Sequence, residues 1–341
     1  MLLNPQSIAI SLILKSVVNS NCFAAYNLQF NKYWFIDTDL GGDCDDVGAV
    51  ALANILKNNN AIELIGMTHT TSLPWGFACI EIVNNYYGNN SIQVGATSRK
   101  NYCEANTNKY AQKMVEAFNY GSINRDKVKD SIKLIRETLI KQQDNSVTFV
   151  CIGQLDNVSD LLDSKPDEIS SLTGIELVKQ KVKEFVVMGG LFKNKDEKVY
   201  FGGYEYEREY NIVTDIKSSQ NFIKKVPVKV VFSDFKVGYQ VYTAKPLLDI
   251  KNMNHPITFS YYHFQNKPRE SWDLLAVYYA AFGDDDIFKT SSNGTVSILD
   301  DGETLFDEST HSNHYYIRLN NSIKYIENKI NNILMEEKIY E

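Results

Sequence analysis

The strongest constraint on the fold is a series of short hydrophobic runs separated by amphipathic stretches. Val147–Ile152 (VTFVCI) and Phe185–Met188 (FVVM) are apolar on both faces. Similar runs occur at Tyr33–Ile36, Ile62–Met67 and Val228–Phe232. Strands of this kind belong to parallel sheets that are covered by helices on both sides. Helical periodicity is found between the runs, at Val47–Leu56, Trp75–Tyr87, Asp130–Lys141 and Asp215–Lys225. The alternation predicts an α/β fold with a doubly wound, mostly parallel, Rossmann-like sheet flanked by helices.

The pattern changes towards the C-terminus. Thr295–Leu299 and His314–Leu319, on either side of the turn Asp300–Glu303, are expected to form added antiparallel strands. A final helix is expected to pack one face on the body, because isoleucines recur at helical spacing at Ile323, Ile326, Ile330 and Ile333. No low-complexity linker divides the sequence, which predicts one domain over residues 31–341.

Residues 1–30 are predicted to be an N-terminal extension or a signal segment. Ile8–Leu14 is apolar and small residues follow near Ala24, but Lys15 interrupts the run and a basic beginning is missing. The apolar run is too short to cross a bilayer, so no membrane span is predicted. The sequence leaves the localisation open between secreted and cytoplasmic.

Composition excludes several classes of partner and cofactor. The chain has 35 basic and 42 acidic residues and a net charge of -7, which argues against binding to a nucleic-acid polymer. Five cysteines without a CxxC pair indicate neither a disulfide scaffold nor a zinc site. Any metal ligands are therefore expected to be carboxylates. The oligomeric state, including a homo-oligomer, is left open.

The segment Asp37–Asp46 (DTDLGGDCDD) places five carboxylates within ten residues, between a predicted strand and a predicted helix. In an open α/β sheet, ligands bind at this place, the carboxyl end of a strand. Gly41 and Gly42 permit the tight backbone path that brings the carboxylates together. Asp45 and Asp46 would lie at the N-terminus of the helix, whose dipole favours their ionised form. So many carboxylates repel one another unless a cation neutralises them, which predicts a bound Ca²⁺ or Mg²⁺.

This loop resembles the N-terminal signature of the inosine–uridine nucleoside hydrolases, Asp-x-Asp-x-Gly-x-Asp-Asp, with two extra residues. Further segments follow the family's order. Val147–Val158 resembles its strand that ends in Gly-x-Leu-x-Asn, and Phe185–Gly190 resembles its Met-Gly-Gly strand end. Glu209–Asn211 resembles its Glu-x-Asn sugar-binding segment, and Ser271–Asp273 resembles its last metal-ligand site. The resemblance runs from about residue 32 to residue 281.

The resemblance implies calcium-dependent hydrolysis of the N-glycosidic bond of ribonucleosides or related N-ribosides. It implies that the calcium ligands are Asp39, Asp46, the backbone carbonyl of Ile152, and Asp273. Asp39 would also be the general base, taking a proton from the metal-bound water as the water attacks the anomeric carbon. The transition state would resemble an oxocarbenium ion.

The resemblance also implies a set of sugar contacts. Glu209 and Asn211 would hold sugar hydroxyls. Because the loop is two residues longer than the family pattern, the sequence leaves open whether Asp43 or Asp45 contacts the sugar beside the metal. Asp37 is expected to support the loop from behind.

The sequence departs from the family on the side that would recognise the leaving base. Trp272 stands where many members have a His, and Gly95–Glu104 lacks the family's His-Gly pair. Trp272 is expected either to stack on the leaving group or to belong to the core. His69 is the candidate general acid, although a single His is more often structural. Substrates whose leaving group needs no protonation, such as p-nitrophenyl riboside or a cationic N-riboside, are therefore expected to be favoured.

Two alternatives compete with this hypothesis. A haloacid-dehalogenase-like phosphatase would use Asp37 as nucleophile and Asp39 as acid, but it also needs an acidic pair after a later strand. Asp234 follows such a strand without a second carboxylate. The other alternative is a calcium-dependent riboside-binding protein without turnover.

Overall fold

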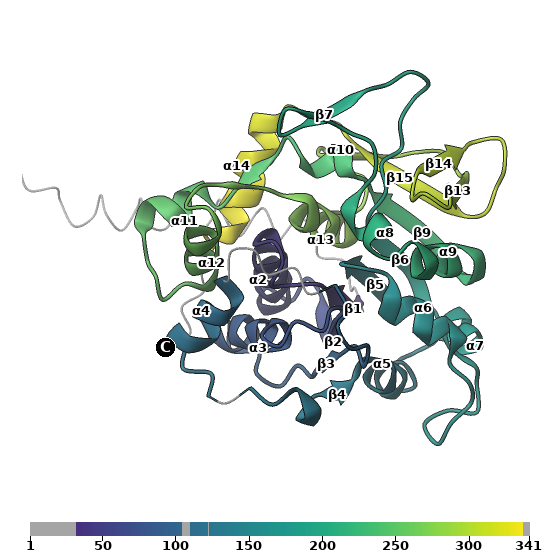
Figure 1. Cartoon of the computed structure of the whole chain (residues 1–341), viewed down its shortest axis with the longest axis horizontal. Helices are drawn as coiled ribbons and strands as arrows, with labels where there is room; N and C mark the ends of the chain where they lie inside the picture. The colour runs from purple at the N-terminus through teal and green to yellow at the C-terminus, as the bar shows by residue number, and fades with distance from the viewer. Residues whose placement is uncertain (1–31, 104–109, 122, 337–341) are drawn as a thin grey trace, which may run out of the picture.

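The computed structural model describes residues 32–103, 110–121 and 123–336. The segment predicted as an extension or signal, residues 1–30, lies outside these ranges. Within the described residues, a nine-stranded sheet is covered by helices on both faces (Figure 1). Its strands are β1 (Tyr33–Thr38), β2 (Glu63–His69), β3 (Val94–Ala96), β4 (Lys129–Asp130), β5 (Val147–Ile152), β6 (Val182–Met188), β9 (Lys229–Ser233), β12 (Phe288–Thr290) and β15 (His314–Leu319).

Short two-stranded sheets are formed by β7 (Val199–Phe201) with β8 (Tyr204–Tyr206), β10 (Tyr242–Thr243) with β11 (Arg269–Glu270), and β13 (Thr295–Ile298) with β14 (Thr304–Asp307). The helices are α2 (Asp45–Asn58), α3 (Gly76–Tyr86), α4 (Tyr110–Ala117), α5 (Ser131–Leu139), α6 (Asp156–Asp163), α7 (Gly174–Lys181), α8 (Tyr210–Thr214), α9 (Ile216–Lys225), α10 (Phe235–Gly238), α11 (Lys245–Ile250), α12 (Pro256–Phe264), α13 (Trp272–Phe282) and α14 (Ile323–Leu334). A 3₁₀ turn spans Arg125–Lys127.

The strand order places β1 at the point where the sheet changes direction. The order is β12-β15-β9-β6-β5-β1-β2-β3-β4, and the neighbours are parallel except for the antiparallel pair β12 and β15. The chain therefore builds outward from β1 on one side and then returns to place β5 on the other, with Thr38 opposite Ile152. Ligands of open α/β sheets bind at such a reversal, outside the carboxyl ends of the strands. The predicted fold class is confirmed.

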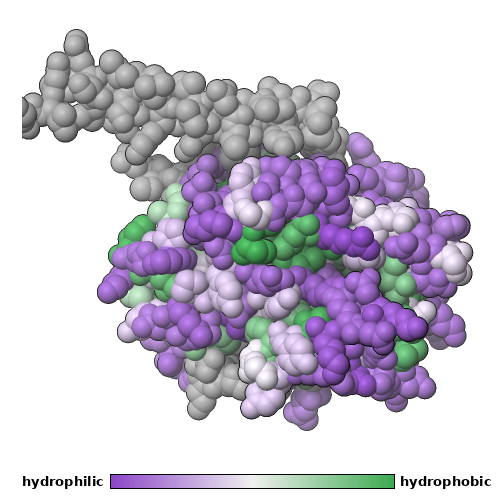
Figure 2. Space-filling view, turned by 90° about the horizontal axis from the view of Figure 1, so that it is seen from above, coloured by the Kyte–Doolittle hydropathy of each residue, from purple (hydrophilic) through white to green (hydrophobic). Residues whose placement is uncertain are grey.

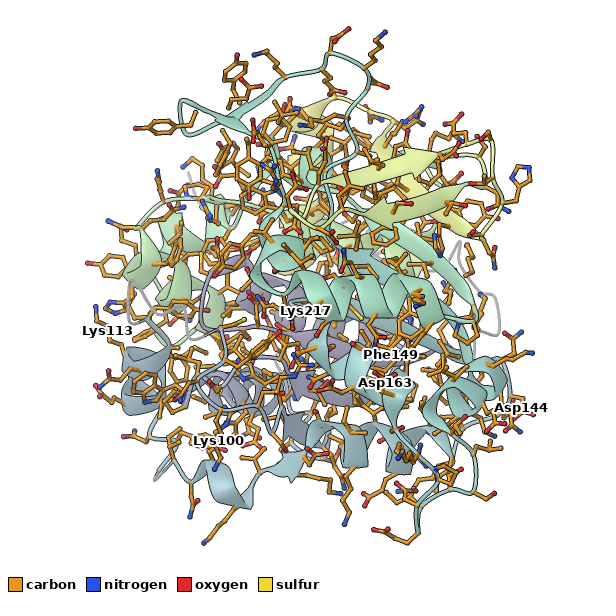
Figure 3. All side chains as sticks on the ribbon, turned by 45° about the vertical axis from the view of Figure 1, so that its right-hand side comes forward. Lys100, Lys113, Asp144, Phe149, Asp163 and Lys217 are labelled. Carbon is orange, nitrogen blue, oxygen red and sulfur yellow. The ribbon has the colours of Figure 1, made fainter. Side chains whose placement is uncertain are left out.

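The central strands divide the core into two layers. Phe35 of β1 and Phe149 of β5 stack at a ring distance of 4.9 Å among the apolar side chains of α5, α6, α7 and α9. Trp34 and Ile36 point to the opposite face and pack with α2, α3, α12 and α13. Figure 3 shows Phe149 inside the body, whereas Asp144 lies at its edge. Strands buried on both faces explain why their sequences lack polar–apolar alternation.

One expectation about the C-terminal region is wrong. Thr295–Leu299 and His314–Leu319 do not pair with each other. Instead, β14, within the stretch following the Asp300–Glu303 turn, takes the antiparallel pairing with β13. β15 joins the main sheet parallel to β9, where it covers an edge that would otherwise expose unpaired backbone groups. The final helix, α14, packs on α2 as expected, with Ile326 and Ile330 fully buried.

Figure 2 shows hydrophilic residues over most of one face, with apolar residues in small separate patches. Among the described helices, none combines the length and the hydrophobicity that crossing a membrane would require.

Candidate active site

The acidic loop connects β1 directly to α2, and a few local contacts fix its path. The hydroxyl of Thr38 donates a hydrogen bond to Asp46 and accepts one from the N–H of Leu40 at 3.1 Å. Gly41 has a φ of +126°, and a Cβ at this position would lie 2.4 Å from the side chain of Leu73. Only glycine meets both conditions without strain. The loop therefore holds its carboxylates in one tight turn at the end of the sheet.

A cavity of about 350 Å³ opens beside this loop, at the carboxyl ends of β1, β5 and β6. Its volume lies within the range of small-molecule sites. All nine residues predicted for the site line it, namely Asp39, Asp43, Asp45, Asp46, Ile152, Glu209, Asn211, Trp272 and Asp273. The fold thus brings together segments that are far apart in the sequence, although the shared cavity does not assign a role to each residue.

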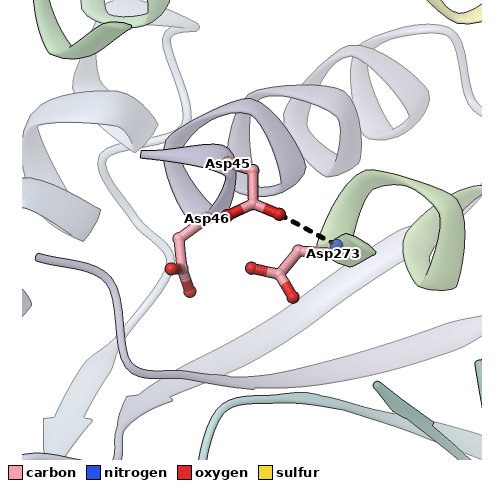
Figure 4. Close-up of side chains that lie close together, drawn as sticks. All are labelled: Asp45, Asp46 and Asp273. Carbon is pink, nitrogen blue, oxygen red and sulfur yellow. Dashed lines mark hydrogen bonds between the residues drawn. The ribbon is translucent and has the colours of Figure 1, made fainter. Parts of the chain in front are cut away.

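Three buried carboxylates converge at one end of the cavity. Asp45, Asp46 and Asp273 each offer an oxygen within 4.8 Å of the others. Figure 4 shows Asp45 and Asp46 at the start of α2 and Asp273 at the start of α13, with the N–H of Asp273 donating to Asp45 at 3.3 Å. The donor set contains only carboxylate oxygens, which fits a hard divalent cation such as Ca²⁺ or Mg²⁺.

Burial and mutual repulsion dominate the electrostatics of these groups. Burial raises the pKa of Asp46 well above its ordinary value, and the charges of Asp39 and Asp45 raise it further. The pKa values of Asp45 and Asp273 are raised for the same two reasons. Burial and repulsion therefore outweigh the α2 dipole, which was expected to favour the ionised forms of Asp45 and Asp46. A bound cation is the natural means of keeping the cluster ionised.

Asp39 lies on the cavity wall but outside this close cluster. Its Oδ2 accepts a hydrogen bond from Gln154 at 3.0 Å, and burial raises its pKa to about 6. The sequence groups Asp39 with Asp46 and Asp273 as metal ligands, and this stays a prediction. The three oxygens that lie within 4.8 Å of one another belong to Asp45, Asp46 and Asp273, and the Asp39 side chain contacts that of Asp46.

Glu209 and Asn211 line the cavity next to the end of β6. The Glu209 carboxylate caps α8 by accepting the N–H groups of Asn211 at 2.7 Å and Ile212 at 3.0 Å. It also accepts the N–H of Gly190 at 3.1 Å, and the Asn211 amide donates to the backbone of Met188 at 3.3 Å. These contacts fix both side chains before any ligand binds, and a carboxylate retains acceptor capacity beyond the three bonds.

Trp272 forms part of an aromatic wall. Its indole N–H donates to the carbonyl of Phe235 at 3.0 Å, and the side chain is almost fully buried. The ring packs on Phe235 at 5.4 Å and edge-on against Phe201 at 5.6 Å. Tyr206 stacks on Phe235 at 4.1 Å. Trp272 thus belongs to the core and also borders the cavity, while its stacking on a leaving group stays a prediction.

Asp43 is engaged by a cation that the sequence analysis missed. Arg269 binds both of its carboxylate oxygens, with Nε at 2.9 and 3.0 Å. Of the two residues left open for the sugar contact, Asp43 is therefore occupied, whereas Asp45 lies in the carboxylate cluster. Nothing in the loop sequence indicates this pairing, since Arg269 arrives from β11.

His69 and Asp37 are buried below the cavity and do not line it. His69 Nε2 donates to the carbonyl of Leu40 at 3.0 Å, so the ring supports the acidic loop. Asp37 accepts hydrogen bonds from Thr68 at 2.5 Å and Asn157 at 2.8 Å. A fully buried Asp37 cannot attack a substrate, which removes the basis of the phosphatase alternative.

The aromatic wall itself was also missed. Phe201 and Tyr206 reach the cavity from the β7–β8 hairpin, while Tyr210 and Phe264 complete its lining. The hairpin turns at Gly202 and Gly203, both with positive φ. A Gly-Gly pair between two aromatic stretches is a hairpin signal that could have been recognised in the sequence.

The family is decided by a sequence comparison that spans most of the chain. Residues 34–328 match the model of the family described as inosine-uridine preferring nucleoside hydrolase. The chain belongs to this family. The nucleoside hydrolases cleave N-glycosyl bonds, so the protein is a hydrolase of that class. The search of curated proteins returns no match to the sequence.

Solved structures agree with this assignment at the level of the fold. An inosine-uridine preferring nucleoside hydrolase from Bacillus anthracis is 15% identical, with a TM-score of 0.66 over 90% of this chain and 100% of that one. A plant nucleoside hydrolase is 16% identical, with a TM-score of 0.67 over 90% and 99%. The type III effector protein XopQ, solved with adenosine diphosphate ribose, is 14% identical, with a TM-score of 0.65 over 97% and 99%.

The buried position of His69 generates a prediction about pH. Burial lowers the pKa of His69 from 6.5 to about 3. Between these two pH values the unfolded chain therefore binds a proton on His69 that the folded chain excludes. The free energy of unfolding should therefore fall as the pH drops from 6.5 towards 3, and His69→Gln should remove this component. At pH 7.5 His69→Leu should be less stable than His69→Gln by about 1–3 kcal/mol, because only the Gln amide can still donate to the Leu40 carbonyl.

Chemical denaturation at a series of pH values measures this effect, with His311→Gln on the exposed surface as the matched control. The pH dependence of substrate hydrolysis should retain its shape in His69→Gln. A change in its acid limb would show that His69 takes part in proton transfer.

Proposed function

We propose that this nucleoside hydrolase uses Ca²⁺ to hydrolyse the N-glycosidic bond of ribonucleosides or related N-ribosides. The observation that carries the proposal is the convergence of the Asp45, Asp46 and Asp273 carboxylates at one end of a cavity of about 350 Å³. The family depends on a metal ion, and an oxygen-only donor set matches the preference of calcium.

The proposed ligands are Asp39, Asp46, the backbone carbonyl of Ile152, and Asp273, with Asp45 beside them. Bound calcium would make a coordinated water easier to deprotonate at neutral pH. Asp39 would take the proton of that water, because its carboxylate lines the cavity beside the cluster. Gln154 supports this role because it orients Asp39 through the hydrogen bond of 3.0 Å.

The sugar would be held between the carboxylate cluster and the end of β6. Asp45 is the proposed contact to a ribose hydroxyl, because Asp43 is paired with Arg269. Glu209 and Asn211, both fixed by backbone hydrogen bonds, are the proposed contacts to the remaining hydroxyls. Together these groups would stabilise the positive charge that develops on the ribose ring.

The leaving group would lie against the aromatic wall of Phe201, Tyr206, Phe235 and Trp272. Among the described residues, no histidine lines the cavity, and the hydroxyls of Tyr206 and Tyr210 have raised pKa values because of burial. This environment supports a preference for leaving groups that depart without protonation. A calcium-dependent riboside-binding protein without turnover is the competing hypothesis, and hydrolysis assays separate the two.

The calcium proposal predicts about one tightly bound ion per chain. Asp273→Asn should abolish hydrolysis of every substrate and remove that ion, because the change deletes one carboxylate of the cluster without altering its volume. Elemental analysis and equilibrium dialysis measure the bound metal, and Asp284→Asn at the surface is the control. Zinc in place of calcium, or no metal after calcium loading, would contradict the proposal.

Sugar specificity is predicted to depend on the 2′-hydroxyl. A 2′-deoxyriboside leaves the groups that bind this hydroxyl without a partner, so its kcat/KM should be lower by roughly a hundredfold or more. Parallel assays of ribosides and 2′-deoxyribosides with the same leaving group test this. Equal rates would argue against the assigned position of the ribose.

Leaving-group preference gives a further prediction. A missing general acid costs about a hundred- to ten-thousandfold, so p-nitrophenyl riboside and a pyridinium riboside should be cleaved much faster than inosine or uridine. Trp272→Phe should change the ratio of these rates more than it changes calcium binding. Tyr206→Phe and Tyr210→Phe are the decisive controls, since a loss confined to inosine would identify a tyrosine as the acid.

A further inference from the structure

Arg269 and Asp43 form an ion pair at the edge of the carboxylate cluster. Nε of Arg269 lies 2.9 and 3.0 Å from the two oxygens of Asp43, and Nη2 makes a further contact to the same carboxylate. The remaining terminal nitrogen, Nη1, binds Glu270 at 2.6 Å. Both residues of the pair border the cavity. The guanidinium therefore meets Asp43 with two parallel contacts, the strongest geometry for such a pair.

The position of this cation is fixed by packing. The guanidinium carbon of Arg269 lies 5.1 Å from the ring centre of Trp272 and 5.4 Å from that of Phe264. Only 16% of the Arg269 side chain is exposed. The hydroxyl of Tyr110 donates to the backbone carbonyl of Asp43, which anchors the other partner. A buried and stacked guanidinium is held in one orientation in a way that a flexible ammonium group would not be.

The pair also joins the two segments that supply the metal-binding carboxylates. Asp43 stands in the loop just before Asp45, and Arg269 stands just before Asp273. Asp43 stands two residues before Asp45, and the guanidinium of Arg269 lies against the Asp43 carboxylate at the edge of the cavity. The positive charge of Arg269 thus neutralises the negative charge of Asp43 next to Asp45.

We propose that Arg269 is a positioning residue that takes the place of a second divalent cation against Asp43 and Asp45, and so limits the site to one metal ion. The proposal rests on the metal site proposed above. Without Arg269, the carboxylates of Asp43 and Asp45 would border the cavity with no protein cation between them, and a divalent ion is the natural means of neutralising such a pair. In this chain the guanidinium of Arg269 pairs with Asp43, which leaves Asp39, Asp45, Asp46 and Asp273 for one ion and the sugar.

Calcium titration of the full chain by isothermal calorimetry tests the proposal. The wild-type chain is expected to bind one calcium ion, and Arg269→Met is expected to bind a second, because Asp43 then lacks its cation. Arg269→Lys retains the charge and should bind one ion. The double variant Arg269→Met/Asp43→Asn removes both charges and should also return to one. Circular dichroism and thermal unfolding establish that each variant is folded.

A second measurement keeps the test decisive if Arg269→Met does not fold. Asp43→Asn leaves the guanidinium paired with Glu270 alone and removes its partner on the side of Asp45, so calcium affinity should fall by roughly ten- to a hundredfold. The double variant should recover most of this loss, because it removes the excess positive charge. Unchanged affinity in Asp43→Asn would overturn the proposal. An affinity in the double variant as low as in Asp43→Asn would also overturn it, since Asp43 would then be a calcium ligand itself.

The outcomes for the two proposals are distinct. If the wild-type chain binds no calcium, the proposed function fails. If the wild-type chain and a folded Arg269→Met variant each bind one ion with the same affinity, the role of Arg269 fails while the proposed function stands.

Discussion

The close approach of buried carboxylates at the end of β1 is the constraint on which the site depends. Asp45 and Asp46 begin α2, Asp273 begins α13, and the two helices pack against each other on one face of the sheet. Their oxygens meet within 4.8 Å, and all three residues are buried at one end of the cavity. Such an arrangement is costly unless a cation shares the charge. The reversal of strand order between β1 and β5 creates the space in which the cation and the sugar can lie.

Local signals explain how much could be predicted from the sequence. The central strands were recognisable because they are apolar on both faces, and β5 coincides with the predicted Val147–Ile152. The acidic loop was recognisable because a strand, a glycine turn and a helix follow one another within a few residues. The position of all predicted site residues around one cavity then follows from the parallel sheet, since the carboxyl ends of its strands meet at one edge.

What could not be predicted depends on contacts between distant segments. Arg269 reaches Asp43 across the fold, and no local pattern in either segment indicates that pair. The same contact occupies Asp43, which is why Asp45 is the proposed sugar contact. β15 was assigned to the wrong partner because both pairings have the same local propensity, and only the open edge of β9 distinguishes them. His69 was a candidate acid until its hydrogen bond to Leu40 placed it below the cavity.

The two ends of the cavity rest on different parts of the fold, and Trp272 connects them. The carboxylate end is built from the rigid starts of α2 and α13, whereas Phe201 and Tyr206 reach the other end from the β7–β8 hairpin. Trp272 adjoins Asp273 on α13, and its indole N–H is already bonded to Phe235. A side chain fixed in this way can shape the space for a leaving group but cannot protonate it. In the proposed mechanism the site therefore stabilises the positive charge of the ribose, and the leaving group would accept the electrons of the broken bond without help from residue 272.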